Sequence, residues 1–392
     1  MLSFPSSVPS FRNWASPAAA IDNQKPKVNG QKKDFSFETE QPKSEKAAQM
    51  KLDGLMRSVK IWPDLFFWRI RGLHSSFNGK GGVPIHYTIF RHHFSRGTFV
   101  LCHGAFENRS HYLSMAKELF KLRYNICLFD QRGFGRSHAL EASRREVVDI
   151  QHPEDMVDDL GQILSIVHDK LGDKPITLVG NSMGGAVIAR YLQEYGETKD
   201  CVKAVVLTAP MLGFYNRYGL KSLGRWIAKK AQDWHLDHYL LPGLQPGSKK
   251  SMWDFYHQLP EAAKIPFLRN AKIAENLDLT QQSSATIRTV NQAFSFTDSI
   301  MDEENLEKSR KLPTLIISGE RDKSVDQEAH MKYLSSLQHP LSRQEVIAKS
   351  HFLIQEIAGE GRLDRFAQEL SEFSEKVSLD QERKENEVRH GG

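Results

Sequence analysis

Residues 176–195 read ITLVGNSMGGAVIARYLQEY, and this stretch decides how the rest of the chain is interpreted. The apolar run 176–179 predicts a strand, and residues 186–192 predict a helix. Between them Ser182 stands in a G-x-S-x-G turn, flanked by Gly180 and Gly184. A serine on so sharp a turn has strained dihedrals, and the flanking residues must be small because the strand and helix backbones nearly touch. The stretch predicts a nucleophilic serine at a helix N-terminus, where N–H groups favour negative charge. The alternative is a glycine-rich turn in which Ser182 only caps the helix.

Apolar strand-like runs alternate with helical patterns on both sides of this stretch. A hairpin is expected around 77–90, and further strands over 98–102, 126–129, 204–207, 314–319 and 345–348. This alternation predicts an α/β fold with a mostly parallel central sheet and helices on both faces. The alternation stops between residues 211 and 305, which are helical, aromatic and basic. We therefore expect a helical lid inserted after the sixth strand.

Five segments follow from these patterns. They are a disordered extension (1–48), an amphipathic helical segment (49–74), an α/β core (75–210 and 306–378), a helical lid (211–305) and a charged C-terminal tail (379–392) that frays. The first 21 residues contain serines and no acid, as transit peptides do, but a flexible tail is the favoured interpretation.

Composition excludes several classes of function. The 392 residues carry a net charge of +5, too weak a bias to indicate a nucleic-acid partner. The sequence contains no run of about 18 apolar residues, so we expect no transmembrane helix. The three cysteines, Cys102, Cys127 and Cys201, lack C-x-x-C spacing, which argues against disulfides and against a zinc site. We expect buried thiols in a reducing, cytoplasmic compartment, and no metal or cofactor.

A serine nucleophile needs a base, and the base needs an acid to orient it. Both should follow the carboxyl ends of later strands, because that edge of a parallel sheet carries the site. Asp322 follows the strand at 314–319, and His351 follows the one at 345–348. The order Ser182, Asp322, His351 is the one expected of this kind of sheet. Asp326 is the alternative acid.

The negative charge that develops during acyl transfer needs preorganised N–H donors. One should be the N–H of Met183, next to the nucleophile. The other should be the N–H of Ala105, which follows His103 and Gly104 in the turn after the strand at 98–102. A plain strand-end turn is the alternative interpretation of His103 and Gly104.

Several motifs together resemble a known family. They are His103-Gly104-Ala105-Phe106-Glu107 with Tyr112, the run from Asp130 to Ser137, Gly180 to Gly185, Ala209-Pro210-Met211, and Gly319-x-x-Asp322. This set, spread over roughly residues 75–375, is similar to α/β-hydrolases of the monoacylglycerol lipase and bacterial lysophospholipase L2 group. The resemblance implies the triad and the Ala105/Met183 oxyanion hole, and a lid that admits single-chain lipids. Asn181 departs from it, since the family more often has histidine there.

The expected lid supports a lipid substrate independently. Residues 211–232 contain no acid, and the basic residues Arg217, Lys221 and Arg225 lie beside aromatic ones such as Trp226. A basic amphipathic helix with tryptophan is typical of a membrane-surface element. The alternative is a lid whose apolar face lines the acyl pocket. The aromatic and basic segment 62–71 could likewise lie at a membrane interface or pack on the domain.

These observations lead to one expectation and two alternatives. We expect a serine hydrolase that cleaves the ester of a monoacyl lipid through an acyl-enzyme at Ser182, as a lysophospholipase or a monoacylglycerol lipase does. The first alternative is acyl transfer from the same intermediate to an alcohol. The second is a hydrolase fold used only for binding, although such a protein has no need to keep all three triad residues. The sequence leaves the head group undetermined.

Overall fold

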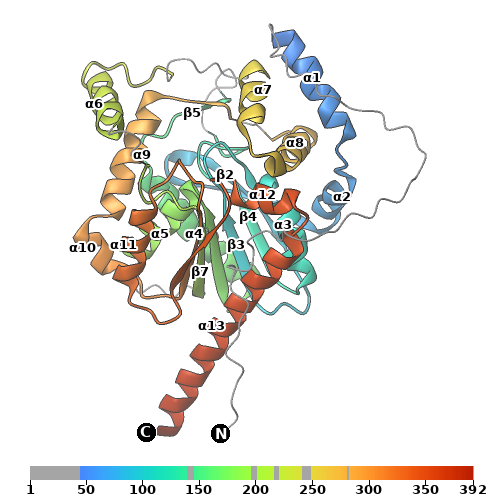
Figure 1. The fold of residues 1–392 in the computed structure, drawn as a ribbon. Coiled ribbons are helices and arrows are strands. Elements are labelled where there is room, and N and C mark those ends of the chain that lie inside the picture. Colours follow the sequence, from blue (N-terminus) through green and yellow to red (C-terminus); the bar gives the residue numbers. More distant parts are fainter. Residues whose placement is uncertain are drawn as a thin grey trace, which may run out of the picture.

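The computed structural model of the protein describes residues 45–138, 145–195, 201–215, 220–240, 249–279 and 282–391. The expected disorder of residues 1–44, and Arg217 of the expected lid, lie outside these ranges. A central sheet runs through the molecule, with helices packed around it and a group of helices above one edge (Figure 1).

The sheet has eight strands in the order β1-β2-β4-β3-β6-β7-β9-β10. Their bounds are β1 (Gly72–Asn78), β2 (Pro84–Phe90), β3 (Thr98–Cys102), β4 (Asn125–Phe129), β6 (Ile176–Asn181), β7 (Val202–Thr208), β9 (Thr314–Gly319) and β10 (Arg343–Ile347). The β1–β2 and β2–β4 pairs are antiparallel, and all other pairs in this sheet are parallel. The predicted α/β fold with a mostly parallel sheet is confirmed. The carboxyl ends of β3, β6, β7, β9 and β10 therefore share one edge.

Helices cover both faces of this sheet. The pair α3 (Leu113–Lys121) and α13 (Leu363–Gly391) pack together on one face, and α4 (Glu154–Leu171) and α5 (Met183–Glu194) pack together on the other (Figure 1). The buried face of α4 has the three-to-four-residue spacing of an amphipathic helix and consists of Met156, Val157, Leu160, Ile163, Leu164 and Val167, together with Asp159. Two shorter helices, α11 (Gln327–Leu337) and α12 (Leu353–Gly359), follow β9 and β10.

Residues 209–313 separate β7 from β9, and we refer to them as the helical insertion. Their described parts form α6 (Leu220–Asp233), α7 (Lys249–Gln258), α8 (Glu261–Asn276), β8 (Ser284–Ala285), α9 (Ile287–Ile300) and α10 (Glu303–Lys308). The expectation of a segment without strands was wrong in one detail: β8 pairs in parallel with β5 (Val147–Val148). Two residues are too few to give a strand pattern in the sequence. Helix α10 also crosses the boundary expected at 305/306.

The segment expected to be helical, 49–74, contains most of one helix, a complete second helix and the first three residues of β1. Helix α1 (Glu45–Ser58) begins before the expected boundary, and α2 (Trp62–Arg71) begins next to Pro63. Proline favours the first turn of a helix and disrupts an interior, so the chain starts a new helix there. Helix α1 packs on α7, and α2 packs on α3. Buried Asp64 anchors α2, since it accepts hydrogen bonds from Lys117 (2.8 Å) and Arg269 (2.7 Å).

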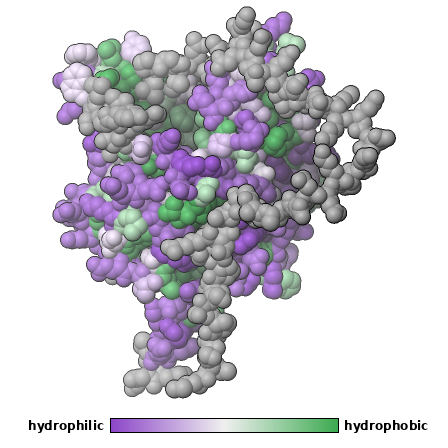
Figure 2. Space-filling view, viewed as in Figure 1, coloured by the Kyte–Doolittle hydropathy of each residue, from purple (hydrophilic) through white to green (hydrophobic). Residues whose placement is uncertain are grey.

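In the C-terminal residues, α13 continues to Gly391 and leads away from the body (Figure 1). Ion pairs one turn apart support it, such as those of Asp380 with Arg383 and Lys384. Among the described helices none is long and apolar enough to cross a membrane. Figure 2 shows a mostly hydrophilic face on which the hydrophobic residues form separate patches.

Candidate active site

Ser182 occupies the turn between β6 and α5, at the edge where the parallel strands end. Its backbone is strained, with φ +48° and ψ −113°. A Cβ on Gly180 would lie 2.8 Å from the backbone of Gly184, and a Cβ on Gly184 would lie 2.2 Å from the carbonyl oxygen of Cys102. No side chain fits at either glycine. The contact of strand and helix thus fixes both glycines and holds the Ser182 side chain above the sheet.

His351 and Asp322 reach Ser182 from the loops after β10 and β9. His351 Nε2 lies 3.0 Å from Ser182 Oγ, and His351 Nδ1 lies 2.8 Å from Asp322 Oδ2. Asp322 Oδ1 accepts the backbone N–H groups of Ser324 (2.7 Å) and Val325 (3.3 Å). Burial opposes ionisation of Asp322, but these hydrogen bonds and His351 hold its pKa below the usual value. The three side chains form the chain of contacts that nucleophilic catalysis by serine requires.

The alternative acid, Asp326, has a different environment. It is the N-cap of α11, where its Oδ1 accepts the N–H of Glu328 at 3.0 Å. The carboxylate that the structure brings to His351 is that of Asp322.

The turn after β3 lies directly beside Ser182. A Cβ on Gly104 would be 3.4 Å from Ser182 Cβ and 3.0 Å from Asn181 Nδ2. Ala105 follows this glycine and is exposed. Met183 is the first residue of α5, so its N–H has no acceptor within the helix. The two residues expected to supply the oxyanion hole, Ala105 and Met183, thus lie in the turn beside Ser182 and directly after it.

His103 fixes the start of this turn. Its side chain is fully buried, its Nδ1 lies 2.8 Å from the carbonyl oxygen of Gly104, and its Nε2 accepts the N–H of Gln131 at 2.9 Å. One nitrogen donates and the other accepts, which requires the neutral imidazole. Burial lowers the pKa of His103 and stabilises the same neutral form. His103 therefore has a structural role and makes no contact in the Ser182–His351–Asp322 chain.

Glu107 joins the turn to three other elements, a role that the sequence did not reveal. Its Oε2 accepts from Gly104 N (2.7 Å), Tyr112 Oη (2.7 Å) and Asn181 Nδ2 (3.3 Å), and its Oε1 accepts from Gln355 Nε2 (2.8 Å). Burial raises the pKa of Glu107, but the neighbouring His111 and these hydrogen bonds outweigh it and hold the pKa below its usual value. An ionised carboxylate thus holds the turn, the end of β6 and helix α12 together. The motif containing Glu107 was visible in the sequence, but Gln355 is 248 residues away and gave no signal.

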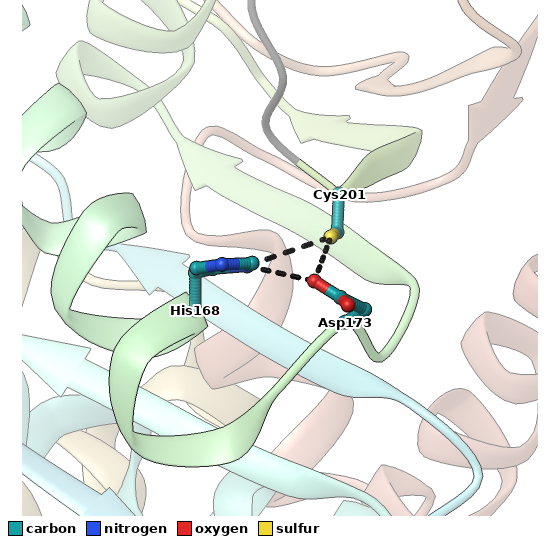
Figure 3. Close-up of side chains that lie close together, drawn as sticks. All are labelled: His168, Asp173 and Cys201. Atoms are coloured by element: carbon teal, nitrogen blue, oxygen red, sulfur yellow. Dashed lines mark hydrogen bonds and ion pairs between the residues drawn. The ribbon is translucent and has the colours of Figure 1, made fainter.

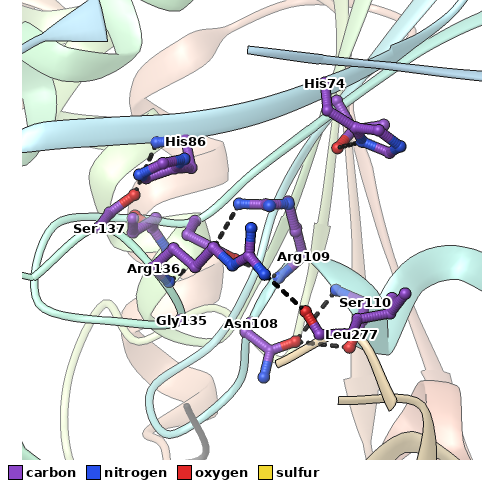
Figure 4. A network of polar contacts seen from close by, with 12 residues as sticks. His74, His86, Asn108, Arg109, Ser110, Gly135, Arg136, Ser137 and Leu277 are labelled. Atoms are coloured by element: carbon purple, nitrogen blue, oxygen red, sulfur yellow. Dashed lines mark hydrogen bonds and ion pairs between the residues drawn. The ribbon is translucent and has the colours of Figure 1, made fainter. Parts of the chain in front are cut away.

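A second polar network supports the turn from below (Figure 4). Asp130 is fully buried and accepts hydrogen bonds from the backbone N–H groups of Arg109 (2.8 Å) and Arg136 (3.0 Å). Arg136 also donates to the carbonyl oxygen of Leu277 at 2.9 Å, at the end of α8. The network connects the loops after β3 and β4 to the helical insertion, with Asp130 as scaffold of these loops.

The helical insertion contacts the site at Met211, whose N–H donates to the carbonyl oxygen of Ser182 at 2.9 Å, and also through α7. Phe255 of α7 packs edge-to-face on Phe352, the neighbour of His351, with ring centroids 5.6 Å apart. Of the residues expected to contact membrane, Trp226 is exposed, but Arg225 forms an ion pair with Asp298 (2.6 Å) and lies over the ring of Phe294. The side chain of Lys221, like Arg217, lies outside the described part of the chain. Arg225 thus holds α6 to α9.

A different cluster offers ligands for a metal ion. Among the described residues, His168, Asp173 and Cys201 bring three potential ligand atoms within 4.8 Å of one another (Figure 3). They lie where β6 and β7 begin, at the edge of the sheet opposite Ser182.

The family model described as serine aminopeptidase, S33 (Hydrolase_4) matches residues 94–356, more than half of the chain. The chain belongs to this family. The predicted resemblance is confirmed, because similar proteins include lysophospholipase L2 of Escherichia coli K12, with 26% identity over 68% of this chain and 75% of that protein. The monoacylglycerol lipase of Mycolicibacterium smegmatis is 29% identical over 36% of this chain and 48% of that protein.

Solved structures share the fold of this S33-family chain. A soluble variant of monoglyceride lipase from Saccharomyces cerevisiae, in complex with a substrate analogue, superposes with a TM-score of 0.57 at 15% identity, covering 78% of this chain and 96% of that one. The monoacylglycerol lipase of Paleococcus ferrophilus gives a TM-score of 0.52 at 18% identity, covering 74% and 99%. The chain is a serine hydrolase of the α/β-hydrolase superfamily, related to lysophospholipase and monoacylglycerol lipase.

Proposed function

We propose that this serine hydrolase cleaves the ester of a monoacyl lipid through an acyl-enzyme at Ser182. The observation that carries the proposal is the unbroken chain from Ser182 Oγ to His351 Nε2 (3.0 Å) and from His351 Nδ1 to Asp322 Oδ2 (2.8 Å). Both links have the length of a hydrogen bond: Ser182 can pass its proton to His351, and Asp322 can hold the imidazole in the tautomer that accepts it.

In the proposed mechanism, Ser182 Oγ attacks the ester carbonyl while His351 Nε2 takes its proton. Asp322 accepts the hydrogen bond from Nδ1–H and stabilises the imidazolium that forms. The N–H groups of Ala105 and Met183 bind the oxyanion. His351 then protonates the departing alcohol, and water, activated by the same nitrogen, releases the fatty acid from Ser182.

The substrate class is supported by the names of the relatives, a lysophospholipase and a monoacylglycerol lipase, both of which act on single-chain lipids. The aromatic contact of Phe255 with Phe352 gives the wall beside His351 an apolar surface, which suits an acyl chain. We include both head groups, glycerol and phosphodiester, in the proposal.

Peripheral contact with a lipid surface is also part of the proposal, and helix α2 is the element that suits it. Trp62, Phe66 and Ile70 are each more than half exposed, and their spacing of four places them on one face. Arg69 and Arg71 are exposed nearby, whereas the acid of this helix, Asp64, is buried and paired. An apolar stripe flanked by cations is typical of helices that lie in an anionic membrane interface.

The test is hydrolysis and active-site labelling by the full chain. Wild-type protein should react with a fluorophosphonate probe and release fatty acid from panels of monoacylglycerols and lysophospholipids. Ser182→Ala should lose both activities, by about a million-fold in rate, while its circular dichroism stays unchanged. Labelling of a folded Ser182→Ala protein would refute the nucleophile, and activity on neither lipid panel would refute the substrate class.

A further inference from the structure

His168, Asp173 and Cys201 come from three separate parts of the chain and meet at one point (Figure 3). His168 lies in the last turn of α4, Asp173 in the connection to β6, and Cys201 immediately before β7. Backbone hydrogen bonds hold all three segments: Gly172 N donates to His168 O at 2.8 Å, and Ile176 N donates to Cys201 O at 2.7 Å. Gly172 has φ +75°, which turns the chain sharply after α4 and returns Asp173 towards His168.

The three ligand atoms have nearly the separations that a tetrahedral zinc ion needs. His168 Nδ1 lies 3.1 Å from Asp173 Oδ1, and Cys201 Sγ lies 3.9 Å from each of them. Zinc–ligand distances of about 2.0–2.3 Å require ligand-to-ligand distances of about 3.4–3.6 Å. Shifts of a few tenths of an ångström would therefore complete the geometry.

The arrangement does not suit the other function of such residues, a cysteine–histidine–aspartate catalytic chain. In that chain the thiol contacts one imidazole nitrogen and the carboxylate contacts the other. Here Cys201 Sγ and Asp173 Oδ1 both approach His168 Nδ1. Three atoms that converge on one another are arranged as ligands around an ion.

The ligand types identify the metal. A thiolate, an imidazole and a carboxylate together favour zinc over the oxygen-binding cations magnesium and calcium. His168 and Asp173 have side chains 47% and 84% exposed, so an ion can reach the cluster and water can supply a fourth ligand. We propose that His168, Asp173 and Cys201 bind a zinc ion that joins the end of α4 to the start of β7. The cluster is separate from the Ser182 site, so the inference is independent of the proposed function.

The experiment is a metal titration of the tag-free full chain after treatment with chelator and reductant. Zinc should bind with a stoichiometry of one per chain, and Co²⁺ in its place should give a thiolate-to-cobalt absorption band. Cys201→Ser and His168→Gln should abolish that band and weaken zinc binding at least tenfold. Asp173→Asn, at a position too exposed to affect folding, should also weaken zinc binding.

His152→Gln is the matched control, since His152 is an exposed histidine away from the cluster. It should keep both the band and the zinc affinity. Thermal unfolding of wild-type protein should shift upward with added zinc, and Asp173→Asn should reduce that shift. A missing cobalt band in wild-type protein would overturn the proposal. So would zinc affinity that Cys201→Ser and Asp173→Asn leave unchanged.

Discussion

Asp322 and Asp326 are four residues apart, and each accepts backbone N–H groups, yet only Asp322 faces His351. The difference comes from where β9 ends and α11 begins. Asp322 lies in the loop between the two elements, whereas Asp326 caps the helix. Sequence position alone left both as candidates for the acid.

Replacing these acids one at a time should separate their roles. Asp322→Asn should lower turnover by roughly ten-thousand-fold, because an amide opposite His351 Nδ1 favours the wrong tautomer. Asp326→Asn should change turnover little, since asparagine is also a good N-cap. Steady-state hydrolysis of a short soluble ester measures both. The opposite order of effects would assign the acid to Asp326.

Glu107 is a partly buried carboxylate that holds the turn beside Ser182. It accepts four hydrogen bonds, including the one from Gly104 next to the proposed oxyanion donor Ala105. The partner Asn181 also accepts a hydrogen bond from Thr208 (2.9 Å), so this residue links β7 to the turn. Asn181, which stands where the family more often has histidine, is therefore part of the support of the site.

Glu107→Gln should lower kcat about 10- to 100-fold and leave KM nearly unchanged. The new amide group would face the amide of Gln355, two donors in opposition, and the turn holding Ala105 would move. Adding Gln355→Glu should restore much of the rate, because the pair again joins a donor to an acceptor. Glu118→Gln, at a surface acid paired with Lys121, is the control. A normal kcat in Glu107→Gln would show that the turn keeps its position without this carboxylate.

At the scale of elements, α2 and α6 both combine aromatic and basic residues, but they differ in what their charges contact. On α6, Arg225 is paired with Asp298, while on α2 the cations Arg69 and Arg71 are exposed. The two helices lie on different sides of the molecule (Figure 1). If the protein binds a vesicle mainly through one of these helices, its binding should therefore depend little on the other helix.

Vesicle flotation with matched variants tests this choice. The triple change Trp62→Ser, Phe66→Ser and Ile70→Ser should greatly reduce binding to anionic vesicles and hydrolysis of lipid in them. The pair Arg69→Gln and Arg71→Gln should weaken binding roughly fivefold per charge, from about 1 kcal/mol each, and reduce its salt dependence.

Trp226→Ser with Ile227→Ser on α6 is the comparison and should have a smaller effect. Hydrolysis of a short soluble ester should stay unchanged in all these variants, because none of the residues contacts the triad. Loss of vesicle binding in the α6 variant alone would transfer the membrane contact to the helical insertion.

At the scale of the whole molecule, the site depends on contacts between the core and segments added to it. Helix α8 packs closely on α12, and a Cβ on Gly359 would overlap the backbone of Ala262. Helix α1 in turn packs on α7, and Lys51 lies 5.3 Å from the ring centre of Trp253. The N-terminal helices α1 and α2, which both precede the matched family region, thus support the helical insertion that borders His351.

The sequence by itself determined the alternation of strands and helices in the core, the mostly parallel sheet and the strand ends that Ser182, Asp322 and His351 follow. These follow from local patterns: an apolar run favours a strand, the glycines permit one sharp turn, and the strand ends share one edge.

Only the tertiary structure decided which partners those residues meet. Helix α2 carries aromatic residues on more than one side, so its pattern could not tell buried Phe67 and Trp68 from exposed Trp62 and Phe66. The pairing of Glu107 with Gln355, of Arg225 with Asp298 and of His168 with Cys201 depends on packing between segments distant in the chain, which periodicity does not encode.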